Sequence, residues 1–485
     1  MLTAGIEQIR AMEQRSIAAG VPEYELMRRA GIGAANWIAA AYHDAARMVI
    51  LAGGGNNGGD ALVAAAGLSR KFPVEIFSTK ALSDFTGCAA HAAADLPPEI
   101  PFFQRSSLSV YDFRPGDVII DGLLGIGFSG GALRSEVKSF IHAANNSRCP
   151  VVALDLPSGI NGDTGSASPD GAIRAEVTIT FGRPKSGLFA GAGGCLRGAL
   201  RVIDIGLMDD GSSGVEIMTD RDAVAMLPHW DLTCHKNSRG RVLLWTGSAE
   251  YPGAAALAVR GAMYGGAGMV RIASEAQLEL PAAAIVRRLS GGEIPENWFP
   301  LADVLVCGCG WGSCGTAANL AAAWQFPGIL LLDADALNTL ARHPEVWRRR
   351  ENLILTPHPG EAVRLAASFG VDSSLNRQNL ALALADKLSA VVVLKGRDTV
   401  VAAADGSSRI IAAGSPALAV AGSGDVLAGV IGALAAQLKH PFDAAALGAY
   451  LHGIAGETAP GMLIADDLPE QVGRIMHQVA GNKLF

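Results

Sequence analysis

Two series of short apolar segments, each alternating with helical segments, constrain the fold of this chain more than any other feature. The first series has apolar runs at 48–52, 73–77, 117–121 and 150–155. The second has runs at 241–245, 302–307, 328–333, 353–356 and 390–395. Strands that are apolar on both faces belong to parallel sheets covered by helices on each side. The sequence therefore predicts an α/β protein with two sheets, the first in a doubly wound, Rossmann-like domain.

A polar, glycine-rich stretch at 208–214 separates the two series and is suited to a linker. We therefore expect a first domain over 1–210 and a second over 220–485. Ahead of the first sheet, residues 6–41 carry apolar positions at helical spacing, with a break at Gly20-Val-Pro22. This pattern predicts two helices before the first strand.

Composition excludes several classes of protein. Half of the residues are hydrophobic and 18% are charged, so the chain can bury a large core and is not disordered. The net charge of −7 is acidic, whereas proteins that bind nucleic acid usually carry excess positive charge. The first residues lack a signal-peptide pattern, and no apolar run is long enough to cross a membrane. We expect a soluble cytoplasmic protein with neither nucleic acid nor membrane as a partner.

Three of the seven cysteines, Cys307, Cys309 and Cys314, cluster in a glycine-rich turn. Their spacing matches no zinc pattern, although a metal site is the alternative interpretation. We expect small buried residues there.

The segment Gly53-Gly-Gly-Asn-Asn-Gly-Gly-Asp60 follows a strand and opens a helix. Its backbone amides can approach a ligand closely. Asn56 and Asn57 supply amide oxygens and Asp60 a carboxylate, which suits polar recognition or a hard monovalent cation. The alternative interpretation is a structural glycine-rich turn, capped by Asn and Asp, that binds no ligand.

Two further strand ends carry a similar pattern. Asp121-Gly-Leu-Leu-Gly-Ile-Gly-Phe-Ser-Gly-Gly131 joins a carboxylate to a glycine-rich loop, and Asp155-Leu-Pro-Ser-Gly159 follows the next strand. Each alone is also compatible with a helix cap or a turn. A doubly wound sheet binds its ligands at the carboxyl ends of its strands, where these segments lie. Two carboxylates beside a cation and a phosphate loop suit proton transfer.

In the second half, Ala421-Gly-Ser-Gly-Asp425 gives the sharpest signal. Its glycines free backbone amides at a helix start, where they can stabilise a phosphoryl group, and Asp425 can take or position a proton. A helix capped by the aspartate is the alternative.

Other second-half segments have weaker signals. Lys395-Gly-Arg-Asp-Thr399 suits nucleotide phosphates, with a solvated turn as the alternative. His358 stands between two prolines and can bond a ligand. Asp333 and Asp335 end a strand and suit either Mg²⁺ or, for Asp335, helix capping.

The first-half motifs together resemble the NAD(P)H-hydrate epimerase domain over about the first 210 residues. The resemblance implies K⁺ ligands at Asn57, Asp121 and Ser158. It implies substrate contacts at Asn56, Asn57, Gly58, Gly59, Asp60 and Asp155, and phosphate contacts at Gly125, Ile126, Gly127, Phe128, Ser129, Gly130 and Gly131. Epimerisation at C6 of the hydrated nicotinamide ring calls for a carboxylate, and we predict that Asp155 provides it.

The second half resembles the ribokinase-like fold through Gly-Ser-Gly-Asp. Tyr251-Pro-Gly-Ala-Ala, Thr356-Pro-His-Pro-Gly-Glu and Lys-Gly-x-x-Thr narrow the resemblance to ADP-dependent NAD(P)H-hydrate dehydratase. It implies contacts to the S hydrate at Ala254, Gly310, His358 and Asp425. It implies nucleotide contacts, with Mg²⁺ and ADP, at Lys395, Gly396, Arg397, Asp398, Thr399 and Gly424.

The two resemblances predict a bifunctional repair enzyme for the hydrates of NADH and NADPH (NADHX and NADPHX), with a homo-oligomeric state expected. Asp425 is predicted to deprotonate the ring hydroxyl for phosphorylation by ADP. A small-molecule kinase of the ribokinase-like class is the main alternative, since the same anion nest suits it. A binding module is another. A dehydrogenase is less favoured, because Gly53 to Asp60 lacks the dinucleotide fingerprint and its downstream acidic residue.

Overall fold

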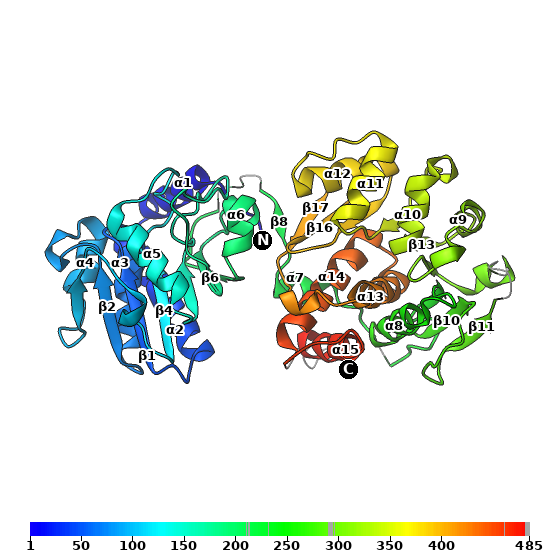
Figure 1. Ribbon diagram of the computed structural model, residues 1–485, viewed down its shortest axis with the longest axis horizontal. Coiled ribbons are helices and arrows are strands. Elements are labelled where there is room, and N and C mark those ends of the chain that lie inside the picture. Colours follow the sequence, from blue (N-terminus) through cyan, green and yellow to red (C-terminus); the bar gives the residue numbers. More distant parts are fainter. Residues whose placement is uncertain are drawn as a thin grey trace. The chain divides into compact units, whose positions relative to one another are not determined.

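The computed structural model describes residues 1–209, 211, 214–230, 232–289, 294, 296–459 and 461–480. It divides into two compact units, Met1–Val215 and Glu216–Phe485 (Figure 1). Residues 210, 212 and 213 of the expected linker lie outside the described residues. Each unit is built on its own sheet.

The first unit has a seven-stranded parallel sheet in the order β3-β2-β1-β4-β5-β6-β7. Its strands are β1 (Arg47–Ala52), β2 (Val74–Ser78), β3 (Phe102–Gln104), β4 (Asp117–Gly122), β5 (Val151–Leu154), β6 (Val177–Phe181) and β7 (Ala199–Ile203). The strand order reverses between β1 and β4, so the loops after these two strands diverge and leave a crevice between them.

Helices cover both faces of this sheet. They are α1 (Ile6–Ala18), α2 (Glu23–Ala41), α3 (Asn56–Leu68), α4 (Gly87–Ala94), α5 (Ser135–Asn146) and α6 (Gly191–Leu196), with short 3₁₀ turns η1 (Leu82–Asp84), η2 (Val110–Asp112) and η3 (Ser186–Phe189). In β1, Met48 and Ile50 pack with α2, α3 and α4, whereas Val49 and Leu51 pack with α5. The doubly wound arrangement and the two leading helices are therefore confirmed.

The second unit has a ten-stranded sheet in the order β11-β10-β9-β12-β13-β14-β15-β16-β17-β8. Its strands are β8 (Glu216–Ile217), β9 (Arg241–Trp245), β10 (Met269–Ser274), β11 (Ile285–Arg288), β12 (Val304–Cys307), β13 (Ile329–Leu332), β14 (Leu353–Leu355), β15 (Val391–Leu394), β16 (Thr399–Ala402) and β17 (Ser408–Ile411). All neighbours are parallel except β15–β16 and β16–β17.

The helices of this unit are α7 (Asp220–Met226), α8 (Pro252–Tyr264), α9 (Ala317–Trp324), α10 (Ala334–Arg342), α11 (Pro359–Phe369), α12 (Arg377–Leu388), α13 (Ser423–Leu438), α14 (Pro441–Thr458) and α15 (Leu468–Ala480). Short 3₁₀ turns are η4 (Glu296–Leu301), η5 (Gly312–Cys314), η6 (Pro344–Val346) and η7 (Pro416–Leu418).

Helix α13 lies at the centre of the second unit. It is apolar on all sides and packs against α8 and α14 (Figure 1). A Cβ atom on Gly429 would lie 2.1 Å from the Ala258 carbonyl oxygen, so glycine allows α13 and α8 to cross closely. This packing fixes the N-terminal turn of α13, which carries Asp425.

Among the described residues, the structure contains no helix with the length and apolar character needed to span a membrane.

Candidate active sites

A cavity of about 810 Å³ opens where the first sheet reverses its strand order. It is lined by the loops after β1, β2, β4, β5 and β6 and by side chains of α1 and α2. The predicted residues that line it are Asn56, Asn57, Asp60, Gly125, Ile126, Gly127, Phe128, Ser129, Gly130 and Asp155. Sequence segments that are about 100 residues apart thus meet in one place, as the sheet topology requires.

The remaining predicted substrate residues are Gly58, Gly59 and Gly131. They do not line the cavity but lie in the backbone that surrounds it. A Cβ atom on Gly58 would lie 1.9 Å from the Gly53 carbonyl oxygen, and one on Gly59 would meet the Met27 side chain at 2.6 Å. The Gly131 carbonyl accepts a hydrogen bond from the Ser168 hydroxyl at 2.8 Å. Gly58 and Gly59 therefore allow α3 to pack closely behind the cavity.

The predicted K⁺ ligands come together at the crevice between β1 and β4. The Asn57 Nδ2 amide donates to the Leu124 carbonyl at 2.8 Å, while Asn57 Oδ1 is buried without a hydrogen-bond partner. Asp121 is fully buried and accepts from the Ser158 amide at 2.8 Å and from the Ser158 hydroxyl at 2.6 Å. Asn57 and Ser158 both donate to the Leu124 carbonyl, so one loop links the unsatisfied amide oxygen to the Ser158–Asp121 pair. Amide, hydroxyl and carboxylate oxygens are a donor set that fits a hard cation.

Burial raises the pKa of Asp121 to about 6, although the bonds from Ser158 act in the opposite direction. In the part of the chain that the structure describes, Asp121 has no lysine or arginine partner. A bound cation would supply the missing positive charge and hold the group ionised.

Asp155 is paired with Lys185, which no sequence motif indicated. Lys185 Nζ donates to the Asp155 carboxylate and, at 2.9 Å, to the Phe181 carbonyl; both side chains are buried. Asp155 adopts φ +64°, a left-handed conformation that is costly for a non-glycine residue and recurs at functional sites. Lys185 follows the end of β6 in Arg-Pro-Lys, and its position just beyond a strand was the available signal.

Two more carboxyl groups face the same cavity. Burial, together with the nearby Asp155 charge, raises the pKa of Asp60 well above its usual value. Burial also raises the pKa of Glu13, which α1 contributes to the cavity wall. Glu13 was not singled out in the sequence, because an acidic residue on an amphipathic helix is usually solvated.

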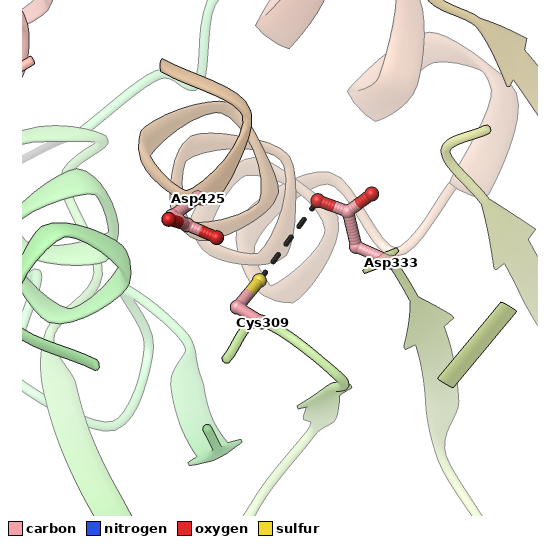
Figure 2. A group of neighbouring side chains, drawn as sticks. All are labelled: Cys309, Asp333 and Asp425. Atoms are coloured by element: carbon pink, nitrogen blue, oxygen red, sulfur yellow. Dashed lines mark hydrogen bonds between the residues drawn. The ribbon is translucent and has the colours of Figure 1, made fainter. Parts of the chain in front are cut away.

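The second unit brings Cys309, Asp333 and Asp425 together at the carboxyl end of its sheet (Figure 2). One potential ligand atom from each residue lies within 4.8 Å of the others. The Cys309 thiol donates to Asp333 Oδ2 at 3.9 Å. Cys307 and Cys309 are fully buried, which confirms the expectation for these two residues, but Cys309 also forms part of an acidic cluster.

Lys395 lies beside this cluster, with its Nζ atom 2.6 Å from Asp333 Oδ1. A Cβ atom on Gly424 would lie 3.4 Å from Lys395 Nζ, so the start of α13 adjoins the lysine. Burial and the Asp333 charge raise the pKa of Asp425 to about 7. Burial lowers the pKa of Lys395, but Asp333 and Glu361 outweigh it and leave that pKa raised.

His358 has a structural bond at the start of α11. Its Nδ1 atom accepts from the Gly360 amide at 3.0 Å, while the His358 amide donates to Glu361 Oε2 at 2.8 Å. Because Nδ1 accepts the bond from Gly360, it carries no proton, and the hydrogen of the neutral imidazole is on Nε2. Burial and the Lys395 charge lower the pKa of His358. Burial raises the pKa of Glu361 to about 7.

The other predicted residues of the second site occupy two turns. Gly310 has φ +61°, and a Cβ atom there would lie 2.7 Å from Ala254 Cβ, so these two residues touch. In the turn after β15, the Thr399 hydroxyl donates to the Gly396 carbonyl at 2.9 Å. Gly396 has φ +140° and Asp398 has φ +53°, while Arg397 is exposed.

The alternative of helix capping by Asp335 is wrong. The N-cap of α10 is Asp333, and Asp335 Oδ2 instead accepts from the Gly312 amide at 2.8 Å. The helix starts directly after β13, which leaves Asp335 inside its first turn and able to reach the neighbouring loop.

Comparison with known proteins covers both units. Residues 242–478 match the family described as NAD(P)H-hydrate dehydratase, and residues 23–187 match the family described as YjeF-related protein N-terminus. The bifunctional NAD(P)H-hydrate repair enzyme Nnr of Escherichia coli is 35% identical, over 96% of this chain and 92% of its own. The chain belongs to this family of bifunctional repair enzymes.

The repair enzyme of Coxiella burnetii is 32% identical over 95% of this chain and 97% of its own. A ribokinase-like superfamily protein from Enterococcus faecalis has a solved structure with a TM-score of 0.51 and 21% identity, covering 56% of this chain and 99% of its own. The predicted family and fold class are thus confirmed, including the ribokinase-like second unit.

Proposed function

We propose that the first unit interconverts the R and S hydrates of NADH and NADPH and that the second dehydrates the S hydrate. The second reaction would consume ADP and release AMP and phosphate. The observation that carries this proposal is that each sheet gathers a separate acid–base centre at its carboxyl edge: Asp155 with Lys185 in one unit, and Asp425 with Asp333 and Lys395 in the other.

Epimerisation inverts C6, and in the proposed route the C6–O bond breaks on one face of the ring and is remade on the other. The Asp155–Lys185 pair can give a proton to the hydroxyl, which leaves as water while the ring nitrogen supplies electrons to C6. Water then adds to the opposite face and returns its proton to the pair. Because Lys185 fixes the Asp155 carboxylate, the proton is held at a defined position.

We assign K⁺ binding to Asn57, Asp121 and Ser158, supported by the unpartnered Asn57 Oδ1 and the buried Asp121. K⁺ would neutralise Asp121 at the end of β4 and join it to the segments after β1 and β5, which carry Asn57 and Ser158. It would thereby support the loop after β4, which carries the predicted phosphate contacts at Gly125 to Gly131.

Replacing K⁺ with tetramethylammonium is expected to lower the epimerisation rate by about tenfold, because an uncompensated buried carboxylate loosens the site. Dehydration of pure S hydrate should be unaffected. As a readout independent of turnover, K⁺ should raise the unfolding temperature of the wild-type chain but not that of Asp121→Asn. Equal K⁺ stabilisation of both proteins would contradict the assignment.

In the second unit, Asp425 accepts the proton of the C6 hydroxyl as its oxygen attacks the β-phosphorus of ADP, and AMP leaves. The phosphate is then expelled from C6 and takes up the proton that leaves C5, which restores the double bond of NAD(P)H. Lys395 and the amides at Gly424 balance the charge that develops on the phosphoryl oxygens. Mg²⁺ with ADP would be held by Asp333, an oxygen ligand that suits it, and would screen the phosphate charge.

The rate of dehydration should rise with pH and level off above about pH 7, because Asp425 acts only when ionised and its pKa is raised to about 7.

The same pKa shift makes stability depend on pH. In the folded state the Asp425 carboxyl keeps its proton up to about pH 7, whereas in the unfolded chain it loses that proton near its usual pKa of 3.8. Between these two values the Asp425 contribution to stability therefore falls as pH rises. Asp425→Asn should show a smaller loss of unfolding temperature from pH 5 to pH 7.5 than the wild type. An unchanged loss would contradict the assignment.

The proposed function is tested by adding the purified chain to a mixed pool of R and S NADHX with ADP, Mg²⁺ and K⁺ and following NADH absorbance. Recovery of NADH from both epimers is expected. Recovery of the S share alone would refute the epimerase assignment, and no recovery would refute the dehydratase assignment. A cytoplasmic location and a homo-oligomeric state stay predictions from the sequence.

A further inference from the structure

The first cavity extends beyond the residues that the proposed function uses. Asp155 and Lys185 lie beyond the ends of β5 and β6, while Thr79 and Lys80 line the cavity at the end of β2. Strands β2, β1, β4 and β5 are consecutive neighbours, so the two ends of the cavity are about 14 Å apart at the usual strand spacing. This span matches a dinucleotide rather than a single ring.

The orientation of such a dinucleotide follows from the chemistry of each end. The reacting ring must lie against Asp155, and the pyrophosphate fits the glycine loops after β1 and β4 at the centre of the cavity. The adenosine half is then directed to the end of β2. In doubly wound nucleotide-binding sheets this position decides between a ribose hydroxyl and a ribose phosphate, because an acidic residue accepts the former and a cation the latter.

Lys80 occupies this position. Its stem crosses the glycine loop, since a Cβ atom on Gly54 would lie 2.6 Å from Lys80 Cδ, and the residue is half-buried. Within the described parts of the chain Lys80 has no carboxylate partner, in contrast to Lys185, whose charge is matched by Asp155. The next acidic residue, Asp84, is exposed. A lysine without an anionic partner in a nucleotide-sized cavity is suited to a phosphate group.

We propose that Lys80 binds the adenosine 2′-phosphate and makes the epimerase site prefer NADPHX over NADHX. This inference rests on the proposed epimerase function and adds a substrate preference to it. A phosphate beside Lys80 could also be the pyrophosphate. Comparing the two hydrates distinguishes these groups, because only NADPHX has the 2′-phosphate whereas both hydrates have the pyrophosphate.

The test measures epimerisation of purified R-NADPHX and R-NADHX by chromatographic separation of the epimers, without ADP, for three full-length proteins. Lys80→Gln should lower kcat/KM about tenfold for NADPHX and change it by less than about twofold for NADHX. Lys71→Gln, an exposed lysine before the opposite end of β2, is the matched control and should leave both values unchanged. An equal loss for both hydrates would assign Lys80 to the pyrophosphate and overturn the proposal, as would no loss.

A binding measurement keeps the inference separate from the proposed function. Adenosine 2′,5′-bisphosphate should bind the wild type and Lys71→Gln more tightly than 5′-AMP does, and Lys80→Gln should lose that difference. Any nucleotide binding in the second unit is the same in all three proteins, so it cancels when their affinity differences are compared. Loss of the difference in a chain that epimerises neither hydrate would retain the Lys80 assignment and refute the epimerase function. A difference that survives Lys80→Gln would overturn the assignment.

Discussion

Asp425→Asn is expected to lower the rate of S-hydrate dehydration by about 1,000-fold, since the loss of a general base typically costs two to four orders of magnitude. Asparagine keeps the size of the side chain but cannot accept the hydroxyl proton. The measurement is AMP release and NADH recovery from pure S-NADHX. Epimerisation of R-NADHX by the same protein should be unchanged, because its centre lies in the other unit.

Folding can be separated from chemistry at this site. Asp425 carries a pKa raised to about 7 in its buried environment, so an uncharged amide should not destabilise the second unit at neutral pH. An unfolding temperature equal to or above that of the wild type is expected together with the lost activity. Cys309→Ser is a matched neighbour that should keep measurable dehydration, because no proton transfer is assigned to the thiol. Retention of activity in Asp425→Asn would overturn the assignment of the base.

Asp155→Asn is expected to reduce epimerisation by about 1,000-fold, because the pair loses the group that exchanges the proton. It should also destabilise the first unit by about 3 kcal/mol, since Lys185 would be left as a buried charge without its partner. The measurements are R-to-S conversion of NADHX and chemical unfolding of the full chain. Dehydration of S-NADHX should persist under conditions where the first unit remains folded.

The double variant Asp155→Asn with Lys185→Met resolves the two effects. Removing both charges should restore much of the lost stability, because no unpaired charge stays buried. Epimerisation should remain absent, since neither remaining side chain transfers a proton. Recovery of activity along with stability would mean that the pair is only structural and would contradict its assigned role.

Much of the fold follows from local sequence pattern. The apolar runs at both halves become the buried strands of two sheets, and Gly20-Val-Pro22 separates α1 from α2. The motifs at Asn57, Asp121 and Asp155 meet in one cavity, because parallel strands place their carboxyl ends at a common edge. Asp335 shows the limit of this reasoning, since its bond to the Gly312 amide depends on a loop from a neighbouring strand.

The sequence by itself determined the two α/β halves, the family and the chemical type of most candidate residues, because periodicity and glycine spacing are local properties. Only the tertiary structure decided which distant charges meet. Lys185 reaches Asp155 because β5 and β6 are neighbours, and Cys309 joins Asp333 because β12 and β13 are neighbours. Burial then set the pKa values of Asp425 and Asp121, since the cost of removing a charge from water depends on the packed surroundings that folding creates.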